Sequence, residues 1–263
     1  MMGLLWLWIT LGVIAFVALI SLIFWLNNNL LKITRYAFFG ISEKGIKVVH
    51  LSDLHGKSFG RKNERLIKKI AAQNPDFICI TGDIIHLYRP RDKAVALQTV
   101  SALKEIAPVL YVAGNHEMRN KGYRFFRKDL MEAGAEVLDD RTVETCGLVV
   151  TGLNGASLKN GTLSKIAPQG ARDILLAHEP QHIARYAEHG YKLILCGHAH
   201  GGQWRIPFTK KGLFAPGQGV FPKYTSGVHC CKNSQMVISR GLGNSEFPLR
   251  LFNRPEIVVI EIN

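Results

Sequence analysis

Aspartate, asparagine and histidine occur at five separated places in the 263-residue chain, each directly after a short apolar run. These places are Asp53 with His55, Asp83, Asn115 with His116, His178, and His198 with His200. Oxygen and imidazole nitrogen are ligands that divalent transition metals accept in proteins. Asp83 stands among the other ligand residues and could bridge two cations, an arrangement that supports in-line displacement at phosphorus. The sequence therefore predicts a two-metal phosphoesterase.

The five motifs differ in how specifically each one indicates a metal site. Asp53-Leu54-His55 is short enough to occur by chance, and Gly82-Asp83 alone is more typical of a turn. Gly197-His198-Ala199-His200 is stronger, because residues two apart on extended backbone point to the same side. The occurrence of all five in order, each at an expected strand end, argues against coincidence.

The elements that must position these residues form an alternating pattern in the first half of the domain. Apolar runs predict strands at 46–51, 77–81 and 109–113, and amphipathic segments predict helices at 63–72, 92–106 and 123–133. Such alternation is typical of a largely parallel sheet covered by helices. Loops at the carboxyl ends of its strands are where ligands gather.

The second half contains shorter expected strands and one clear helix. The strands are expected at 136–138, 143–146, 148–153, 174–177, 193–196, 236–239 and 257–262, and the helix at 181–189. The first three of these strands suggest a meander. The whole pattern predicts an α/β fold in which two mixed sheets pack face to face with helices outside them, an αββα sandwich.

Taken together, the motifs resemble those of the calcineurin-like metallophosphoesterases. That family has the order D-x-H, G-D, G-N-H-E or G-N-H-D, a lone H, and G-H-x-H. The chain matches it with Asp53/His55, Gly82-Asp83, Gly114-Asn115-His116-Glu117, His178, and Gly197-His198-Ala199-His200. The resemblance extends from about residue 47 to residue 263. It implies one metal ion held by Asp53, His55, Asp83 and His200, and a second held by Asp83, Asn115, His178 and His198.

The resemblance also implies a role for the two cations and for His116. Divalent cations lower the pKa of bound water, so that hydroxide can attack phosphorus near neutral pH. We expect Mn, with Fe, Zn or Ni as alternatives, because the ligands are nitrogen and oxygen without thiolate. His116 lies outside both ligand sets and is the candidate general acid for the leaving oxygen. The alternative is a histidine that only supports the ligands.

The N-terminus is apolar. Residues 3–26 carry no charged side chain and are long enough to cross a hydrocarbon core of roughly 30 Å, so we expect a transmembrane helix. A cleaved signal peptide is the alternative, but no Lys or Arg precedes the run and residues 26–29 form a poor cleavage site. The basic residues that follow are Lys32, Arg35, Lys44 and Lys47. They predict a single-pass protein of the inner membrane with its catalytic domain in the cytoplasm.

The rest of the chain divides into two parts. Residues 27–44 are expected to form a juxtamembrane segment that lies on the bilayer or packs against the domain, and residues 45–263 the metallophosphoesterase domain. The formal net charge of +13 suits anionic lipid, phosphorylated substrates or nucleic acid. With an anchor in the same chain, the anionic membrane surface is the simplest partner, and we expect no nucleic acid. The five cysteines contain no C-x-x-C pattern, and the sequence carries no signal for an oligomeric state.

Two further segments bear on the substrate. A basic run after His116 comprises Arg119, Lys121, Arg124, Arg127 and Lys128. It is either a solvated helix face or a collar for a phosphate-bearing headgroup, in which Arg119 and Arg124 are the candidate substrate contacts. Residues 201–227 form a long loop rich in aromatic and basic residues, which either admits a lipid at the interface or covers the core.

Within the family, three short stretches resemble a membrane-anchored phosphodiesterase subgroup that includes UDP-2,3-diacylglucosamine pyrophosphatases of lipid A synthesis. These stretches are Gly201-Gly202-Gln203, Ser239-Arg240-Gly241-Leu242-Gly243 and Pro248-Leu249-Arg250. Ala199 departs from the subgroup, which usually has Thr there, but it is not a ligand. Arg240 is a candidate contact for the substrate phosphate, or a structural arginine at the strand ends.

The resemblance to this subgroup implies hydrolysis of a lipid-linked phosphate ester, namely UDP-2,3-diacylglucosamine to UMP and 2,3-diacylglucosamine 1-phosphate. Two alternatives stay open. One is a nuclease or other phosphodiesterase with the same metal centre, which the basic charge favours. The other is a non-catalytic membrane-bound metal scaffold.

Overall fold

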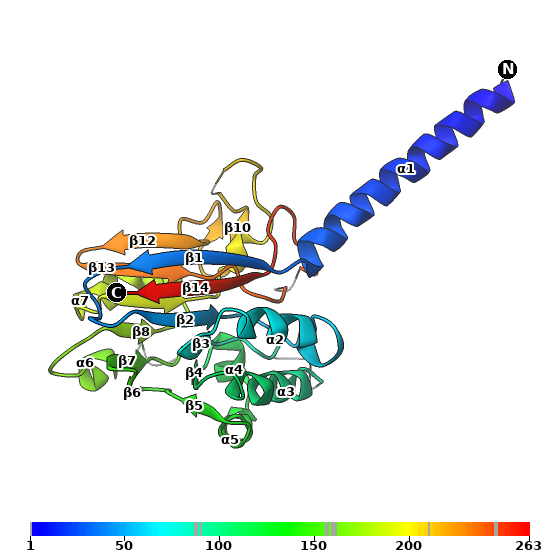
Figure 1. The fold of residues 1–263 in the computed structure, drawn as a ribbon. Coiled ribbons are helices and arrows are strands. Elements are labelled where there is room, and N and C mark those ends of the chain that lie inside the picture. The colour runs from blue at the N-terminus through cyan, green and yellow to red at the C-terminus, as the bar shows by residue number, and fades with distance from the viewer. Residues whose placement is uncertain are drawn as a thin grey trace.

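The structure, a computed structural model, describes residues 2–86, 89, 91–155, 158, 162–209, 211–244 and 247–263. Two six-stranded sheets form the centre of the domain (Figure 1). The strand order is β1-β14-β2-β3-β4-β5 in the first sheet and β12-β13-β9-β8-β7-β6 in the second. The predicted α/β fold with two mixed sheets is confirmed.

The first sheet contains the parallel unit predicted from the sequence. Its strands are β1 (Lys32–Phe38), β2 (Ile46–Leu51), β3 (Phe77–Thr81), β4 (Val109–Val112), β5 (Ala135–Val137) and β14 (Glu256–Ile262). The four strands from β2 to β5 are parallel, as expected for connections that pass through helices. The helices on the outer face are α2 (Glu64–Ala71), α3 (Asp92–Lys104) and α5 (Tyr123–Glu132), whose buried side chains share one apolar core with the sheet.

The second sheet is more irregular. Its strands are β6 (Arg141–Thr145), β7 (Leu148–Gly152), β8 (Ile174–Leu176), β9 (Leu193–Cys196), β12 (Gly227–Cys231) and β13 (Ser234–Ile238). Two hairpins, β6–β7 and β12–β13, flank a parallel centre. The helices α6 (Thr162–Ile166) and α7 (Ile183–Glu188) lie along the sequence between its strands, and a separate apolar core lies on this side.

A third apolar core lies between the two sheets. It includes Phe77 and Leu110 from the first sheet, and Leu176 and Leu195 from the second. The central strands are therefore buried on both faces, which explains why they are continuous apolar runs in the sequence. The layers are helices, sheet, sheet and helices.

The segment at 27–44, which we expected to be juxtamembrane, enters the first sheet. β1 pairs in parallel with β14, from Lys32 opposite Glu256 to Phe38 opposite Ile262. Phe38 belongs to the core between the sheets. Of the two placements expected for 27–44, on the bilayer or packed against the domain, the structure has the second for residues 32–38, which form an edge strand of the first sheet.

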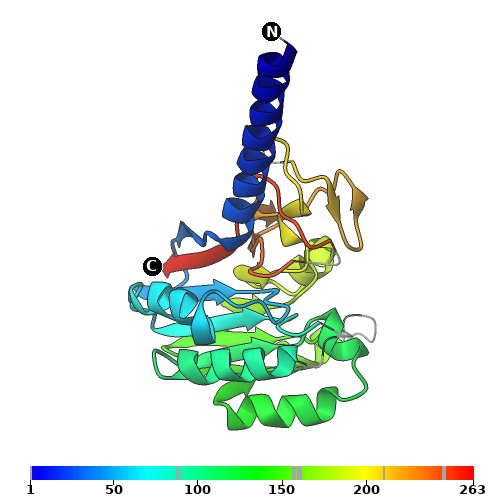
Figure 2. The same cartoon turned by 90° about the vertical axis from the view of Figure 1, so that its right-hand side faces the viewer.

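Before β1, α1 (Met2–Asn29) projects from the domain (Figures 1 and 2). It is long and apolar enough to cross a membrane, and none of its most apolar window is buried. It contains the whole of the span expected at 3–26 and continues for three residues past that span's end.

The end of α1 is hydrogen-bonded to the loop before β14. Asn28 Oδ1 accepts from the backbone N–H of Arg250 at 3.2 Å and from Asn244 Nδ2 at 3.1 Å. Asn27 Oδ1 accepts from the backbone N–H of Asn253 at 3.1 Å. The helix therefore joins the domain through direct contacts rather than through a free linker.

Arg250, at the centre of this junction, is fully buried and serves as a donor to backbone carbonyls. Its Nε donates to Gly243 O at 3.0 Å and its Nη2 to Arg240 O at 2.9 Å. We expect Arg250→Met to destabilise the domain by about 3 kcal/mol, because buried carbonyls lose their donors. The midpoint of thermal unfolding should fall by roughly 6–12 °C. Arg254→Met is the control, since Arg254 is exposed and should change the midpoint much less.

Candidate metal centre

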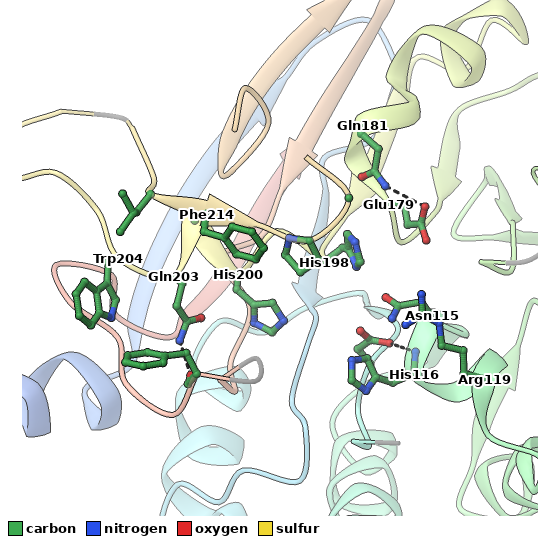
Figure 3. Close-up of a pocket in the computed structure, with 16 residues that line it drawn as sticks. Asn115, His116, Arg119, Glu179, Gln181, His198, His200, Gln203, Trp204 and Phe214 are labelled. Carbon is green, nitrogen blue, oxygen red and sulfur yellow. Dashed lines mark hydrogen bonds between the residues drawn. The ribbon is translucent and has the colours of Figure 1, made fainter. Parts of the chain in front are cut away.

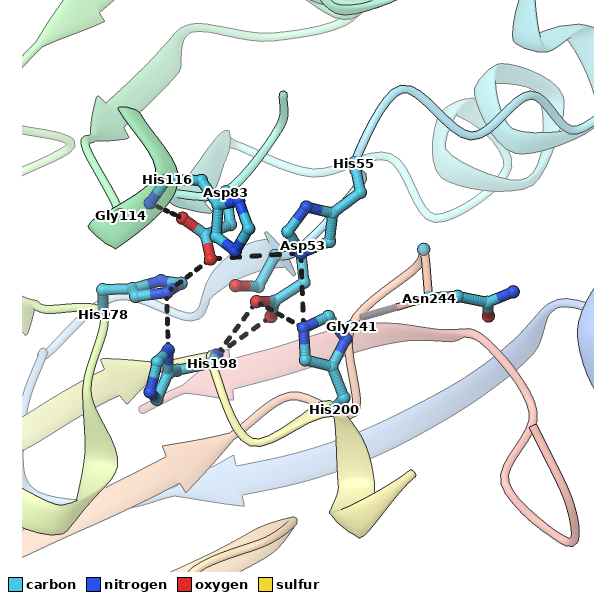
Figure 4. Close-up of polar contacts among 12 residues, drawn as sticks. Asp53, His55, Asp83, Gly114, His116, His178, His198, His200, Gly241 and Asn244 are labelled. Atoms are coloured by element: carbon cyan, nitrogen blue, oxygen red, sulfur yellow. Dashed lines mark hydrogen bonds and ion pairs between the residues drawn. The ribbon is translucent and has the colours of Figure 1, made fainter. Parts of the chain in front are cut away.

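The predicted ligands lie on loops that follow five strands and meet at one edge of the two sheets (Figure 4). Asp53 and His55 follow β2, and Asp83 follows β3. Asn115 and His116 open the short helix α4 (Asn115–Arg119) after β4. From the second sheet, His178 follows β8, and His198 and His200 follow β9. The structure therefore brings together all seven residues that the sequence placed in the metal site.

One group of donors consists of Asp53, His55 and His200. One ligand atom from each lies within 4.8 Å of the others, and all three residues are buried. His55 Nε2 is 3.3 Å from His200 Nε2, and His200 Nε2 is 3.6 Å from Asp53 Oδ1. Nitrogen and oxygen atoms that converge in this way fit a divalent transition metal.

A second group consists of Asp83, His178 and His198, also buried and within 4.8 Å. His178 Nε2 is 3.0 Å from Asp83 Oδ2, 3.1 Å from Asn115 Oδ1 and 3.1 Å from His198 Nδ1. Asn115 therefore adds an amide oxygen to this group. The donors again fit a divalent cation.

Asp83 lies between the groups. Its Oδ2 is 3.0 Å from His178 and 3.9 Å from His55 Nε2, which belongs to the first group. Its Oδ1 accepts the backbone N–H of His116 at 2.8 Å. The carboxylate is thus held in place and faces both groups, as a bridging ligand must.

Burial favours neutral imidazole in most of the site. It lowers the pKa of His55 to about 3, and burial together with the charge of His178 lowers the pKa of His198 to about 4. Neutral imidazole is the form that binds metal. His178 differs, since burial is outweighed by the charge and hydrogen bond of Asp83, which raise its pKa to about 10. The negative charge of Asp83 thus stabilises a positive charge at this place. A bound cation would supply such a charge.

The backbone at the ligands adopts conformations that are uncommon for residues with side chains. The φ angles are positive at Asp53, His55, Asp83, His198 and His200, from 47° to 67°. Such left-handed residues cluster at functional sites, where the surrounding structure holds them. Gly114 is required here, because a Cβ at that position would lie 2.2 Å from Asp83 Oδ1.

Glu117 supports this loop, a role that was not expected from the sequence. It is fully buried, and its Oε2 accepts the backbone N–H groups of Asp83 at 2.7 Å and Gly114 at 2.9 Å. Its Oε1 accepts from the N–H of Ile85 at 3.1 Å. Burial and the charge of Asp83 raise its pKa to about 8. The acidic fourth position of the G-N-H-E motif was the signal that could have identified it.

Asn253 supports His200 in the same way. Its side-chain Nδ2 donates to His200 O at 2.7 Å and to Gln203 O at 3.0 Å. Because the backbone N–H of Asn253 donates to Asn27, this residue links the end of α1 to a metal-site loop. The sequence carries no motif that points to it.

His116 lies beside Asp83 at the edge of the site. Its ring packs against those of His55 and His86, with centroid distances of 4.8 Å and 4.7 Å. One of its ring nitrogens lies within 4.8 Å of donor atoms of His55 and Asp83. It also lines the large cavity in front of the site, so it can reach both the ligands and a bound substrate.

This cavity has a volume of about 830 Å³ and is lined by polar and aromatic side chains (Figure 3). Asn115, His116 and Arg119 lie on one side, and Trp204 and Phe214 on the other. Asp83, His198 and His200 also line it, so the donor atoms are open to it. The aromatic side comes from the loop 201–227, which contains β10 (Phe214–Ala215) and β11 (Gly219–Val220) and whose residue 210 lies outside the described residues.

The three arginines predicted as substrate contacts occupy different places. Arg119 lines the cavity in front of the metal site. Arg124 is exposed on α5, with its guanidinium 5.2 Å from the ring of Phe125, and does not line this cavity. Arg240 lines a different cavity, where its Nε lies 3.6 Å from Glu256 Oε1. Of the three, the structure brings only Arg119 to the metal site.

Comparison with known proteins agrees with this geometry. Residues 46–202 match the family model described as calcineurin-like phosphoesterase. The chain is 30% identical to the uncharacterised metallophosphoesterase YkuE of Bacillus subtilis, over 83% of this chain and 79% of the relative. It is 28% identical to the phosphodiesterase YaeI of Escherichia coli, over 87% of this chain and 86% of that protein.

The fold is also found in a solved structure. The protein TT1561 of Thermus thermophilus matches with a TM-score of 0.51 and 15% identity, over 76% of this chain and 91% of that one. Both the motif order and the matched region place the donor loops inside the family domain. The chain therefore belongs to the calcineurin-like phosphoesterase family and is a metal-dependent phosphoester hydrolase.

Proposed function

We propose that the chain is a membrane-tethered phosphodiesterase or pyrophosphatase that hydrolyses a lipid-linked phosphate ester. The observation that carries this is Asp83, which faces two donor groups at the base of a cavity with an aromatic side. The proposed substrate is UDP-2,3-diacylglucosamine, cleaved to UMP and 2,3-diacylglucosamine 1-phosphate in lipid A biosynthesis. We propose Mn as the metal, with Fe, Zn or Ni as alternatives.

An apolar surface near the cavity supports a lipid substrate. Phe214 and Phe247 line the cavity and are about half exposed, at 50% and 48%. The loop that carries Phe214 lies at the same end of the domain as α1 (Figures 1 and 2). Apolar side chains at the mouth of a site beside a membrane anchor suit acyl chains.

The proposed location is the inner membrane, with the domain in the cytoplasm. The basic residues Lys32 and Arg35 follow α1 directly, and cytoplasmic flanks of membrane helices carry such an excess. An anionic membrane surface is the proposed partner, in line with the net charge of +13.

The chain's own residues have separable roles in this reaction. When bound, the metal ions lower the pKa of water and offset charge on the phosphate. One metal ion would be held by Asp53, His55 and His200, and the other by Asn115, His178 and His198. Asp83 would be a ligand of both. Arg119 lines the cavity and would pair with a phosphate oxygen there. His116 is placed to give a proton to the leaving oxygen.

The test uses the full chain in a neutral detergent, stripped of metal with a chelator and reloaded with Mn, Fe, Zn or Ni. We expect hydrolysis of UDP-2,3-diacylglucosamine and of a chromogenic phosphodiester, lost on stripping and regained with Mn. A panel of DNA and simple phosphomonoesters should react much more slowly. Preferred cleavage of DNA would replace this substrate with a nuclease function, and metal binding without any hydrolysis would identify a scaffold.

His116→Ala should reduce kcat most strongly for substrates with a poor leaving group. General acids contribute roughly 10²–10⁴-fold, so an alkyl phosphodiester should lose about that factor. For a p-nitrophenyl ester, whose leaving group needs little protonation, kcat should fall by a much smaller factor. Rates for both esters, compared at equal metal content, check this prediction. Equal losses for both would mean that His116 supports the ligands instead.

A further inference from the structure

A second large cavity lies on the other side of the loop 201–227 and does not contain the metal-site residues. Its volume is about 780 Å³. Trp204 and Leu213 line the metal-site cavity, whereas Arg205 and Lys211 line this one. The loop thus separates two cavities, and the function proposed above uses only the first. We call the second one the basic cavity.

The charged side chains among the described residues that line the basic cavity are all basic. Its basic side chains are Arg205, Lys211, Lys223, His229 and Arg240. None of the described residues that line it is acidic. The hydroxyl groups of Tyr36, Thr225 and Ser226 add possible hydrogen-bond donors. This composition suits an anion with several acceptor oxygens.

Only one buried carboxylate lies next to these arginines among the described residues. Glu256 is 3.6 Å from Arg240 Nε, and its oxygens already accept from the hydroxyl of Thr34 at 2.5 Å and the backbone N–H of Arg240 at 3.0 Å. Arg240 Nε is buried and makes no hydrogen bond within the part of the chain that the structure describes. Among the described residues, Glu256 is therefore the one buried carboxylate beside a cluster of basic side chains. The charges of this cluster act on one another, and its members are Arg240, Arg205, Arg254 and Lys32.

Arg205 is built into the wall rather than lying on the surface. It is 7% exposed, and its Nη1 donates to Gly201 O at 2.9 Å and to Ser226 Oγ at 3.0 Å. Burial and then the charge of Arg240 lower its pKa to about 10. A bound anion would offset the repulsion between the two guanidinium groups.

The rim of the basic cavity is apolar. Ile206, Phe221 and Val228 line it and are exposed by 40%, 63% and 39%. Tyr36 belongs to β1, which begins shortly after the end of α1. The cavity therefore combines the buried Arg205, the exposed Lys211 and Lys223, and exposed apolar side chains at its rim.

We propose that the basic cavity binds a phosphate group carried by an amphiphile, the headgroup of an anionic lipid, with the apolar part leaving over Phe221. Two features carry this: the excess of basic over acidic side chains among the described lining residues, and the exposed apolar side chains at the rim. Phosphate is a tetrahedral anion that arginine and lysine bind through charge-assisted hydrogen bonds. The proposal is independent of the hydrolytic function, since no residue of the metal site takes part.

The test measures binding of short-chain phosphatidylglycerol to the full chain in neutral detergent, by titration calorimetry. The experiment is run in the Asp83→Ala background, so that hydrolysis and binding at the metal centre do not contribute. Short-chain phosphatidylcholine, glycerol phosphate and inorganic phosphate are the comparison ligands. We expect phosphatidylglycerol to bind at least about tenfold more tightly than glycerol phosphate, because only the lipid reaches the apolar rim.

Variants assign the binding to this cavity. The pair Lys211→Gln with Lys223→Gln should weaken phosphatidylglycerol at least about tenfold, since each lysine contributes on the order of 1 kcal/mol towards an anionic lipid. Lys68→Gln with Lys69→Gln removes the same charge from exposed positions on α2 and should change nothing. Phe221→Ser should weaken the lipid but not glycerol phosphate.

Three outcomes would overturn the proposal. Equal affinity for phosphatidylglycerol and phosphatidylcholine would remove the role of charge. Equal affinity for the lipid and glycerol phosphate would show that a free phosphate ester, not a lipid, is the ligand. Equal losses in both lysine pairs would mean that the lipid responds only to overall charge. Thermal unfolding of every variant confirms that the fold is kept.

Discussion

Asp83→Ala should reduce phosphodiester hydrolysis by more than about 10³-fold, on the order of 4 kcal/mol of transition-state stabilisation. The reason is the position of the carboxylate, which is 3.0 Å from His178 and 3.9 Å from His55 and so faces both donor groups. Asp83 converges with His178 and His198 on one side and with His55 and His116 on the other. The loss should appear as reduced kcat together with reduced metal content per chain.

Two comparisons make this result specific. Asp83→Asn keeps the size of the side chain and an oxygen for the N–H of His116, but it removes the negative charge, so its activity should also be very low. Asp129→Asn changes a carboxylate on α5, outside the metal site, and should retain normal metal content and rate. Normal turnover by Asp83→Ala would refute the two-metal assignment.

Glu117→Ala should act on stability as well as on rate. The side chain accepts three backbone N–H groups, from Asp83, Gly114 and Ile85, and it is fully buried. Unpaired buried donors cost about 1–3 kcal/mol each, so we expect at least about 3 kcal/mol of destabilisation. Because one donor is the N–H of Asp83, the rate should fall as well, by about 10²-fold or more.

Glu117→Gln separates geometry from charge. Its amide oxygen can take the place of Oε2 and keep two of the three bonds, but its amide nitrogen would then face the N–H of Ile85. Stability should therefore decrease from the wild type to Glu117→Gln and further to Glu117→Ala, and thermal unfolding measures this order. Glu132→Ala, at an exposed position of α5, is the matched control. A glutamine variant less stable than the alanine variant would contradict this account.

Much of the metal site is predictable because it depends on a local rule. A buried strand is an apolar run, the chain must turn where the strand ends, and a polar residue at that turn lies at the sheet edge. Asp83 after β3 and His198 after β9 both follow this rule. The order of five such motifs then identifies the family, even though their convergence depends on two separate sheets.

The features that sequence reasoning missed depend on distant parts of the chain. β1 pairs with β14, whose residues lie 224 positions later, and nothing within 27–44 signals this partner. Arg240 follows a strand end just as the ligands do, yet its side chain turns towards Glu256 rather than the metal site. The backbone carbonyl of Arg240 instead accepts a hydrogen bond from Arg250. A motif can therefore determine the position of the main chain without determining the direction of the side chain.

The asparagines at the end of α1 have a mechanical consequence. Since Asn27 and Asn28 bond directly to the loop that carries Arg250 and Asn253, we expect a tilt of the helix to be passed on to the domain. A spanning helix leans further from the bilayer normal when the surrounding membrane is thin. In the membrane-tethered state proposed above, that lean would swing the domain, and with it the mouth of each cavity, relative to the lipid headgroups. In that state, membrane thickness would set how far the proposed lipid substrate has to rise to reach the metal site.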